Sequence, residues 1–461
     1  MTHTKQLFGT DGIRGVAEEF PLTRDSVYLI GRALGHDLVR VNAQARVVIG
    51  QDTRVSSRWI ADRFLQGLAS VGVGTRSAGV ITTPGVAFLA RSQGFDAGAV
   101  ISASHNPWTD NGIKIFSGNG YKLPDARELA IEKEIFALLQ ADALPPPDST
   151  PEISSLPGEE SLRQAYISWL ASSVSSDLSR LRVAVDCANG AATAEAPELF
   201  RALKINTTFL HSAPDGQNIN ENCGALHPET VARYVYESFV ENQGRFDVGV
   251  TFDGDADRAL FCDAHGRVVN GDAVLLVAAR DMQSRGALAN AIVVATTMSN
   301  MGLELALKRS GIRVLRANVG DKYVLEEMQR VGAKLGGEQS GHILFLDGEA
   351  TTGDGLLTAL RVLEIMVRTG KPLADLVSDL KVFPQTIRNV RVRKKIPFAE
   401  IPPVQAAIAA AERELDGNGR VVVRYSGTEA LARVMIEAES KEQMDRVAES
   451  IVGAIRSALG A

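Results

Sequence analysis

Apolar strand segments and amphipathic helix patterns alternate through the first four fifths of the chain. Near the start, the pattern predicts buried strands at Arg46–Asp52 and Gly98–Ser102 and helices at Val55–Val71 and Asp125–Ala143. The same alternation predicts further strands at 182–187, 204–210, 247–253, 291–297 and 312–317, and helices at 191–203, 228–242, 272–284, 300–309 and from 321. Strands and helices that alternate over short connections are typical of α/β domains, and three such stretches favour a repeated architecture.

The last part of the chain has a different order of elements. A strand at Phe383–Lys395, a helix at Val404–Leu415, a strand pair within Gly419–Ser440 and a helix at Lys441–Leu459 predict a small α+β domain. Earlier, the segment 144–158 holds five prolines in fifteen residues. Because proline blocks helix continuation and removes a backbone donor, this segment is a predicted linker or domain boundary.

Composition excludes several classes of protein. The chain has 461 residues, of which 45% are hydrophobic, and 49 basic against 55 acidic residues give a net charge of −6. This argues against a largely disordered chain and against a nucleic-acid binder, which needs a basic face. No apolar run is long enough for a membrane span or a signal peptide. Cys187, Cys223 and Cys262 lie far apart without C-x-x-C spacing, so we expect a reducing, cytoplasmic setting.

Three carboxylates two residues apart follow a predicted strand. If the backbone stays extended, Asp253, Asp255 and Asp257 point to one side, where a hard cation relieves their repulsion. Oxygen ligands without Cys or His favour Mg²⁺, Ca²⁺ or Mn²⁺. An EF-hand is excluded, because the sixth position is Arg258 and the twelfth is Ala264. The alternative interpretation is a solvated acidic turn.

The second candidate is the sequence SASHNP at 102–107. A hydroxyl beside a histidine at the end of a strand is a candidate nucleophile or phosphoryl carrier. No G-x-S-x-G elbow surrounds it, which disfavours an α/β-hydrolase. Asp110, Asn111 and Lys114 follow closely. Taken alone, the motif also fits a simple turn in which Ser and Asn bond backbone amides.

Three further motifs are compatible with phosphate or sugar binding. RYSGTE at 424–429 combines an arginine, two hydroxyls and a glycine, and is either a phosphate cradle or a hairpin turn. GGEQSGH at 336–342 suits sugar hydroxyls or is an ordinary polar loop, and FGTDGIRG at 8–15 lines a phosphate site or forms a tight turn. A P-loop and a dinucleotide fingerprint are both absent from the sequence.

Together, FGTDGIRG, SASHNP, DGDADR, GEQSGH and RYSGTE resemble the motifs of the α-D-phosphohexomutases, in this order and over essentially the whole chain. Within that superfamily the sequence is most similar to the bacterial phosphoglucosamine mutases. The resemblance implies three related α/β domains and a smaller C-terminal α+β domain around a central cleft. The boundaries that we expect are 1–152, 153–263, 264–380 and 381–461.

The resemblance also implies residue roles. Ser104 is expected to carry the phosphoryl group, and that phosphoserine is expected to hold Mg²⁺ together with Asp253, Asp255 and Asp257. Four further active-site residues are expected, with Lys114 as general acid/base: Arg14, His105, Lys114 and Arg258. Seven residues are expected to bind substrate: Glu338, Ser340, His342, Arg424, Ser426, Gly427 and Thr428. Tyr425 and Ala430 stand where the family pattern has prolines, which predicts a less preorganised loop. Ala256 stands where glycine is more common, a mild change.

The implied reaction is interconversion of glucosamine 6-phosphate and glucosamine 1-phosphate through a hexose bisphosphate, with hexose 1,6-bisphosphate as activator. Glucose or mannose phosphates are the alternative substrates. Two other hypotheses are a regulatory protein that has lost turnover and a metal-dependent phosphatase using the same aspartates. The expected partner is a phosphosugar, without nucleic acid or membrane, and the sequence is compatible with a monomer or a homo-oligomer.

Overall fold

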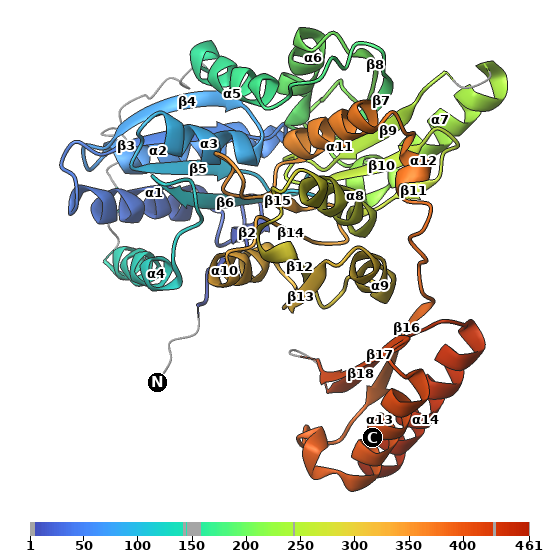
Figure 1. The fold of residues 1–461 in the computed structure, drawn as a ribbon. Helices are drawn as coiled ribbons and strands as arrows, with labels where there is room; N and C mark the ends of the chain where they lie inside the picture. The colour runs from blue at the N-terminus through green and yellow to red at the C-terminus, as the bar shows by residue number, and fades with distance from the viewer. Residues whose placement is uncertain (1–4, 142–143, 145–157, 243–244, 427–429, 461) are drawn as a thin grey trace. The chain divides into compact units, whose positions relative to one another are not determined.

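The computed structural model describes residues 5–141, 144, 158–242, 245–426 and 430–460. The chain forms two compact units. The first comprises Met1–Thr297 and Leu315–Val377, and the second comprises Met298–Val314 and Ser378–Ala461. Figure 1 traces the elements along the chain.

The first sheet has six strands in the order β1-β2-β6-β5-β3-β4. The strands are β1 (Phe8–Gly9), β2 (Gly12–Val16), β3 (Arg46–Gln51), β4 (Gly74–Val80), β5 (Ala97–Ile101) and β6 (Asp110–Ser117). Both faces carry helices: α1 (Arg24–Val39), α2 (Val55–Ala69), α3 (Thr83–Ser92) and α4 (Asp125–Gln140). Alternation along β3 explains the two layers. Val47 and Ile49 join the core formed with α1, α2 and α4, whereas Gly50 faces α3.

The second sheet has five strands in the order β11-β10-β9-β7-β8. They are β7 (Arg182–Asp186), β8 (Asn206–Leu210), β9 (Val248–Phe252), β10 (Ala259–Asp263) and β11 (Val268–Val269). Strands β8, β7 and β9 are parallel, so their carboxyl ends meet at one edge. The associated helices are α5 (Glu160–Ser172), α6 (Ala192–Ala202) and α7 (Pro228–Asn242).

The third sheet is smaller, in the order β13-β12-β14-β15. Its strands are β12 (Ile292–Thr296), β13 (Arg313–Ala317), β14 (Leu335–Gly337) and β15 (Ile343–Phe345). The helices of this stretch are α8 (Gly271–Ser284), α9 (Met301–Arg309), α10 (Asp321–Val331), α11 (Gly355–Thr369) and α12 (Leu373–Leu376). Asn270 and Asp354 accept backbone N–H groups and so cap α8 and α11.

The second unit is built on an antiparallel sheet in the order β16-β18-β17. Its strands are β16 (Gln385–Arg391), β17 (Gly419–Tyr425) and β18 (Leu431–Ala438), and its long helices are α13 (Pro402–Leu415) and α14 (Lys441–Leu459). Buried side chains of the sheet and both helices form one core, including Val434, Val404 and Ile451.

The predicted fold class is confirmed, with the fourth domain of a different type. Helices α7 and α14 have the predicted bounds, α10 begins at the predicted residue, and the bounds of the other predicted elements differ by a few residues at one or both ends. Among the strands of the first two sheets and the helices that accompany them, several elements have no counterpart among the predictions: β1, β2, β4, β6, β10, β11, α1, α3 and α5. The predicted linker falls almost wholly outside the described residues.

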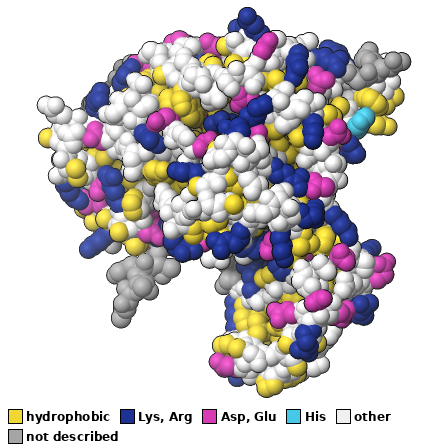
Figure 2. Space-filling view, in the orientation of Figure 1, with side chains coloured by type: hydrophobic (Ala, Val, Ile, Leu, Met, Phe, Trp, Pro, Cys, Tyr) yellow, Lys and Arg dark blue, Asp and Glu magenta, His cyan; other side chains and the backbone are white. Residues whose placement is uncertain are grey.

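No helix among the described residues is long and apolar enough to cross a membrane. On the face shown in Figure 2, basic and acidic side chains are interspersed, which fits the small net charge of −6.

Candidate active site

Ser104 lies just beyond β5 in a tightly held turn. Its backbone has a φ of 53°, in the left-handed region that non-glycine residues seldom occupy, and its side chain is buried. The backbone N–H of Ser104 donates to Ser102 Oγ at 2.9 Å, and Ser102 Oγ–H donates to Asp52 Oδ2 at 2.6 Å. The hydroxyl of Ser104 is therefore placed by a buried polar chain, as an ordered site requires.

Two side chains from other segments hold the same turn from its carbonyl side. Arg54 donates to the carbonyl oxygens of Ser104 at 3.1 Å and Asn106 at 2.5 Å. Asn220, from the second sheet's loops, donates to the same two oxygens at 3.0 and 3.2 Å. A Cβ added at Gly254 would lie 2.5 Å from the Ser104 carbonyl oxygen, so only glycine permits this approach.

The Ser104 hydroxyl faces an acid and an imidazole. Its Oγ–H donates to Asp253 Oδ2 at 2.6 Å, and its Oγ lies 3.1 Å from His105 Nδ1. Burial, Arg258 and Arg14 lower the pKa of His105 to about 4, so its imidazole is neutral near pH 7. The hydroxyl of Ser104 therefore faces a carboxyl group on one side and a neutral imidazole on the other.

Asp253, Asp255 and Asp257 converge as predicted, with carboxylate oxygens within 4.8 Å of one another. The expectation of an extended backbone is wrong, because the residues form a turn directly after β9. Ala256 takes a φ of 53° within it, and its N–H donates to the carbonyl of Asp253. The turn gathers the carboxylates that an extended strand would have spaced along one face.

Lys114 is the cation at the centre of this acidic group. It lies on β6 and is 1% exposed. Its Nζ donates to Asp255 Oδ2 at 2.7 Å and lies 3.4 Å from Asp257 Oδ2 and 2.9 Å from Asp11 Oδ2. Burial lowers the pKa of Lys114, but these three carboxylates outweigh it and hold the pKa well above its usual range.

The acidic turn fits a bound cation. Asp255 Oδ1 and Asp257 Oδ1 are buried and accept no hydrogen bond within the described chain. Burial, Asp257 and Asp255 raise the pKa of Asp253 to about 7, a sign of mutual repulsion that a cation would relieve. Because the ligands are all oxygens, the group suits a hard ion of the Mg²⁺ type.

Further charged residues surround this group. Arg14 pairs with Asp11 and donates to Asn106 Oδ1 at 3.5 Å, and Lys122 bridges Asp11 at 2.6 Å and Asp321 at 2.5 Å. The Nε of Arg258 lies 3.9 Å from both Asp253 and Asp257, and no hydrogen-bond acceptor meets it in the described part of the chain. Arg258 is thus placed to meet an added anion.

The GEQSGH loop lies next to the acidic turn. The N–H of Ala259 donates to the carbonyl of Gly341, and Glu338 Oε1 accepts the N–H of Gly320 at 3.1 Å. Ser340 Oγ lies 3.4 Å from Glu338 Oε2. The imidazole of His342 is buried, with Nδ1 3.5 Å from Asp257 Oδ1. The structure therefore places His342 against the acidic turn, with Ser340 next to Glu338 in the same loop.

The predicted phosphate residues of the RYSGTE motif belong to the second unit. Arg424 is exposed on β17, and the carbonyl of Ser426 accepts from Lys395 Nζ at 2.7 Å. The hydroxyl of Tyr425 donates to the carbonyl of Ile396 at 2.5 Å, and its ring stacks on another ring. Tyr425 therefore anchors the start of the loop that proline would otherwise stiffen. Gly427 and Thr428 lie outside the described residues.

Four family models match the chain in sequence. They are the phosphoglucomutase/phosphomannomutase α/β/α domains I, II and III, over residues 5–142, 164–266 and 270–383, and the C-terminal domain over 388–454. The chain belongs to the phosphoglucomutase/phosphomannomutase family. Its predicted membership of the phosphohexomutases is thereby confirmed.

Individual members of the family resemble the chain over nearly its full length. The phosphoglucosamine mutase of Koribacter versatilis is 62% identical, covering 99% of this chain and 98% of the relative. That of Solibacter usitatus is 52% identical, covering 99% of both. A solved phosphoglucomutase/phosphomannomutase family protein from Burkholderia thailandensis is 25% identical, with a TM-score of 0.79 and 99% coverage of both chains.

A second solved structure shares the fold at lower identity. It is the Aspergillus fumigatus N-acetylphosphoglucosamine mutase in complex with GlcNAc-6P and magnesium, 20% identical with a TM-score of 0.64. The match covers 99% of this chain and 96% of that one.

Sequence reasoning missed the residues that position the family motifs. Asp52, Arg54 and Asn220 hold the Ser104 turn, and Asp11 and Lys122 extend the charge network. The predicted neighbour Asn111 instead bonds two serine hydroxyls of α2, at 2.8 and 3.0 Å. The available signal for Asp52 was its place directly after a buried strand.

Proposed function

We propose that this chain is a phosphoglucosamine mutase, an isomerase that interconverts glucosamine 6-phosphate and glucosamine 1-phosphate. The observation that carries the proposal is the buried Ser104 hydroxyl, 2.6 Å from Asp253 within an oxygen-only acidic turn. The relative at 62% identity, which has this name, supports the substrate. The three unpaired cysteines support a cytoplasmic setting.

In the proposed mechanism, Ser104 begins as a phosphoserine. A sugar hydroxyl attacks its phosphorus, the Ser104 Oγ–P bond breaks and a sugar O–P bond forms, giving a bisphosphate. The proton released by the sugar hydroxyl is balanced by the one that the Ser104 oxygen takes up. The bisphosphate then reorients so that its other phosphate faces Ser104, and the same step runs in reverse to return that phosphoryl group to Ser104.

The residues around Ser104 divide the remaining work. Lys114, kept protonated by Asp11 and Asp255, is the proposed acid toward the departing Ser104 oxygen. Arg258 is proposed to bind the transferring phosphoryl group. Asp253, Asp255 and Asp257 would hold Mg²⁺, which when bound supplies neutralising charge to the phosphoryl group.

The sugar and the second phosphate are assigned to the other loops. Glu338, Ser340 and His342 are proposed to contact the sugar and to be supported by the neighbouring acidic turn. Arg424, Ser426, Gly427 and Thr428 are proposed to hold the phosphate that is not transferred. Four domains at 1–152, 153–263, 264–380 and 381–461 remain part of this proposal.

A substrate panel tests the proposal. Glucosamine, N-acetylglucosamine, glucose and mannose phosphates would each be assayed with Mg²⁺ and a catalytic trace of hexose 1,6-bisphosphate. We expect the highest kcat/KM for glucosamine phosphates. A higher value for glucose or mannose phosphates would overturn the substrate and leave the phosphoserine mechanism standing. Release of inorganic phosphate in place of isomerised sugar would indicate a phosphatase.

A further inference from the structure

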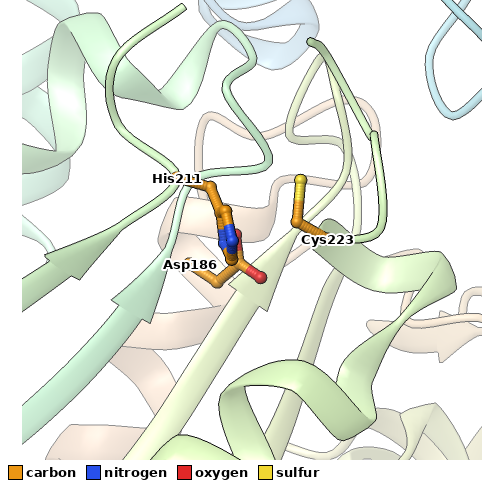
Figure 3. Close-up of side chains that lie close together, drawn as sticks. All are labelled: Asp186, His211 and Cys223. Atoms are coloured by element: carbon orange, nitrogen blue, oxygen red, sulfur yellow. The ribbon is translucent and has the colours of Figure 1, made fainter.

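A second group of metal-binding side chains lies at the edge of the second sheet. Asp186 ends β7, His211 directly follows β8, and Cys223 directly precedes the 3₁₀ turn Gly224–Leu226. One ligand atom from each lies within 4.8 Å of the others, and Figure 3 shows the three side chains close together. Because β7 and β8 are parallel, their carboxyl ends bring Asp186 and His211 together.

His211 and Asp186 form a close ion pair, and the two side chains are near enough for both to bind one ion. Nδ1 of His211 lies 3.1 Å from Asp186 Oδ1. That nitrogen is buried, yet it makes no aligned hydrogen bond with any described residue. In a tetrahedral zinc site with bonds of about 2.0–2.1 Å, neighbouring ligand atoms are roughly 3.3 Å apart.

Backbone donors fix the carboxylate of Asp186. The N–H of Ala188 donates to Oδ1 at 2.9 Å, and the N–H of Gly224 donates to Oδ2 at 3.0 Å. Metal-bound carboxylates are commonly oriented by such outer hydrogen bonds. Because Gly224 follows Cys223, the second bond also places the thiol next to the carboxylate.

The donor set differs in kind from that of the acidic turn. An imidazole, a thiol and a carboxylate suit Zn²⁺ or Co²⁺, whereas the all-oxygen turn suits Mg²⁺. Asp186 and Cys223 are buried, and the side chain of His211 is 33% exposed. A water molecule can therefore complete a four-coordinate site from the His211 side.

We propose that Asp186, His211 and Cys223 form a transition-metal site for Zn²⁺ or Co²⁺. On binding, the thiol of Cys223 loses its proton to solvent and a metal–sulfur bond forms, with no change of oxidation state. The site joins the ends of β7 and β8 to the loop that carries Asn220, the residue that bonds the carbonyls of the Ser104 turn. Its role is therefore to hold that loop.

Cobalt titration of the full-length, chelator-treated and dialysed protein tests the proposal. We expect near-ultraviolet charge-transfer absorption of a cobalt–thiolate bond, removed by added Zn²⁺. The absorption band should be absent in Cys223→Ser and retained in the matched thiol control Cys262→Ala. In His211→Ala, the affinity for Co²⁺ should be about 10-fold or more weaker than in the wild type. It should also persist in Asp253→Asn, because the acidic turn offers no sulfur.

A missing band in the wild type, or one that survives in Cys223→Ser, would overturn the site. If Cys223→Ser does not fold, a band of undiminished affinity in His211→Ala decides against it in the same way. Since absorbance requires no turnover, failure here leaves the proposed mutase function standing, and failure of the substrate panel leaves this site standing.

Discussion

The charged side chains around Ser104 and those at the end of β17 differ in burial. Around Ser104, Asp253 and Lys114 are 0% and 1% exposed, and Lys114 lies within 3.4 Å of three carboxylates. At the end of β17, Arg424 is exposed to solvent. Buried charged side chains hold one another in position before a substrate binds. An exposed arginine is not held in this way, and it contributes to substrate affinity only when the substrate binds.

This difference predicts where mutations have their effects. Substitutions around Ser104 should reduce turnover and, where they leave a buried charge unpaired, stability as well. Changes at Arg424 should mainly affect substrate affinity. The following experiments test that division, from the largest expected effect to the smallest.

Replacing Ser104 should have the largest effect. Ser104→Ala removes the proposed phosphoryl carrier, so we expect mutase activity to fall by roughly three orders of magnitude or more. Intact-protein mass spectrometry should find one phosphate on active wild type, mapped to Ser104, and none on the variant. Thermal unfolding of the variant serves as the control for folding. Near-normal turnover by Ser104→Ala would exclude the phosphoserine mechanism.

Loss of one carboxylate from the acidic turn should come next. Asp255→Asn or Asp257→Asn removes a charged oxygen, and we expect kcat to fall about a hundredfold or more. Excess chelator should likewise inactivate the wild type, and added Mg²⁺ should restore it. The matched control is Asp263→Asn, a buried aspartate of β10 outside the acidic turn. Full activity in the presence of chelator would contradict the metal assignment.

Replacing Lys114 tests how much its buried charge contributes to the stability of the protein. Lys114→Met leaves the buried carboxylate of Asp255 without its cation, so the free energy of unfolding should fall by about 3–5 kcal/mol. Urea unfolding in the presence of chelator measures this effect without compensation by a metal. A loss below about 1 kcal/mol, the range of an exposed ion pair, would mean that the charges around Ser104 are no more ordered than those at the protein surface.

Arg424 should give the smallest and most selective effect. Arg424→Ala should raise KM by about 10- to 150-fold, equal to the 1.5–3 kcal/mol of a charge-assisted hydrogen bond, with kcat little changed. Arg446→Ala is the matched control, because Arg446 is an exposed arginine of the same unit that pairs with Glu414. Unchanged KM in Arg424→Ala, or a stability loss as large as that of Lys114→Met, would remove the contrast between the two regions.

The sequence predicted the elements with strong periodicity and left out those without it. Helices α7 and α14 carry clear amphipathic patterns, and their bounds agree with the structure. Strand β6 was missed because Asp110, Asn111 and Lys114 interrupt its apolar pattern. These polar residues are stabilised by partners distant in sequence, such as Asp255 for Lys114, which periodicity does not reveal.

In the candidate site, too, the sequence identified residues that are close in the chain and missed partners that are distant in it. The side chains of Asp253, Asp255 and Asp257 were grouped correctly from their spacing, although the backbone is a turn. The supporting network of Asp11, Lys122 and Asp321 joins segments more than one hundred residues apart, so neither spacing nor composition identifies it.

The burial of Ser104 has a consequence for how this serine is first phosphorylated. A protein kinase takes an extended, accessible segment of its substrate into its own active site, and this serine sits in a tight turn with its side chain enclosed. If Ser104 carries the group that we propose, the first phosphoryl group must arrive on a molecule small enough to reach this buried hydroxyl. An enzyme molecule that releases the bisphosphate before the second transfer is left with an unphosphorylated Ser104, and it stays inactive until such a small donor binds. The concentration of that donor therefore controls the fraction of enzyme molecules that are active.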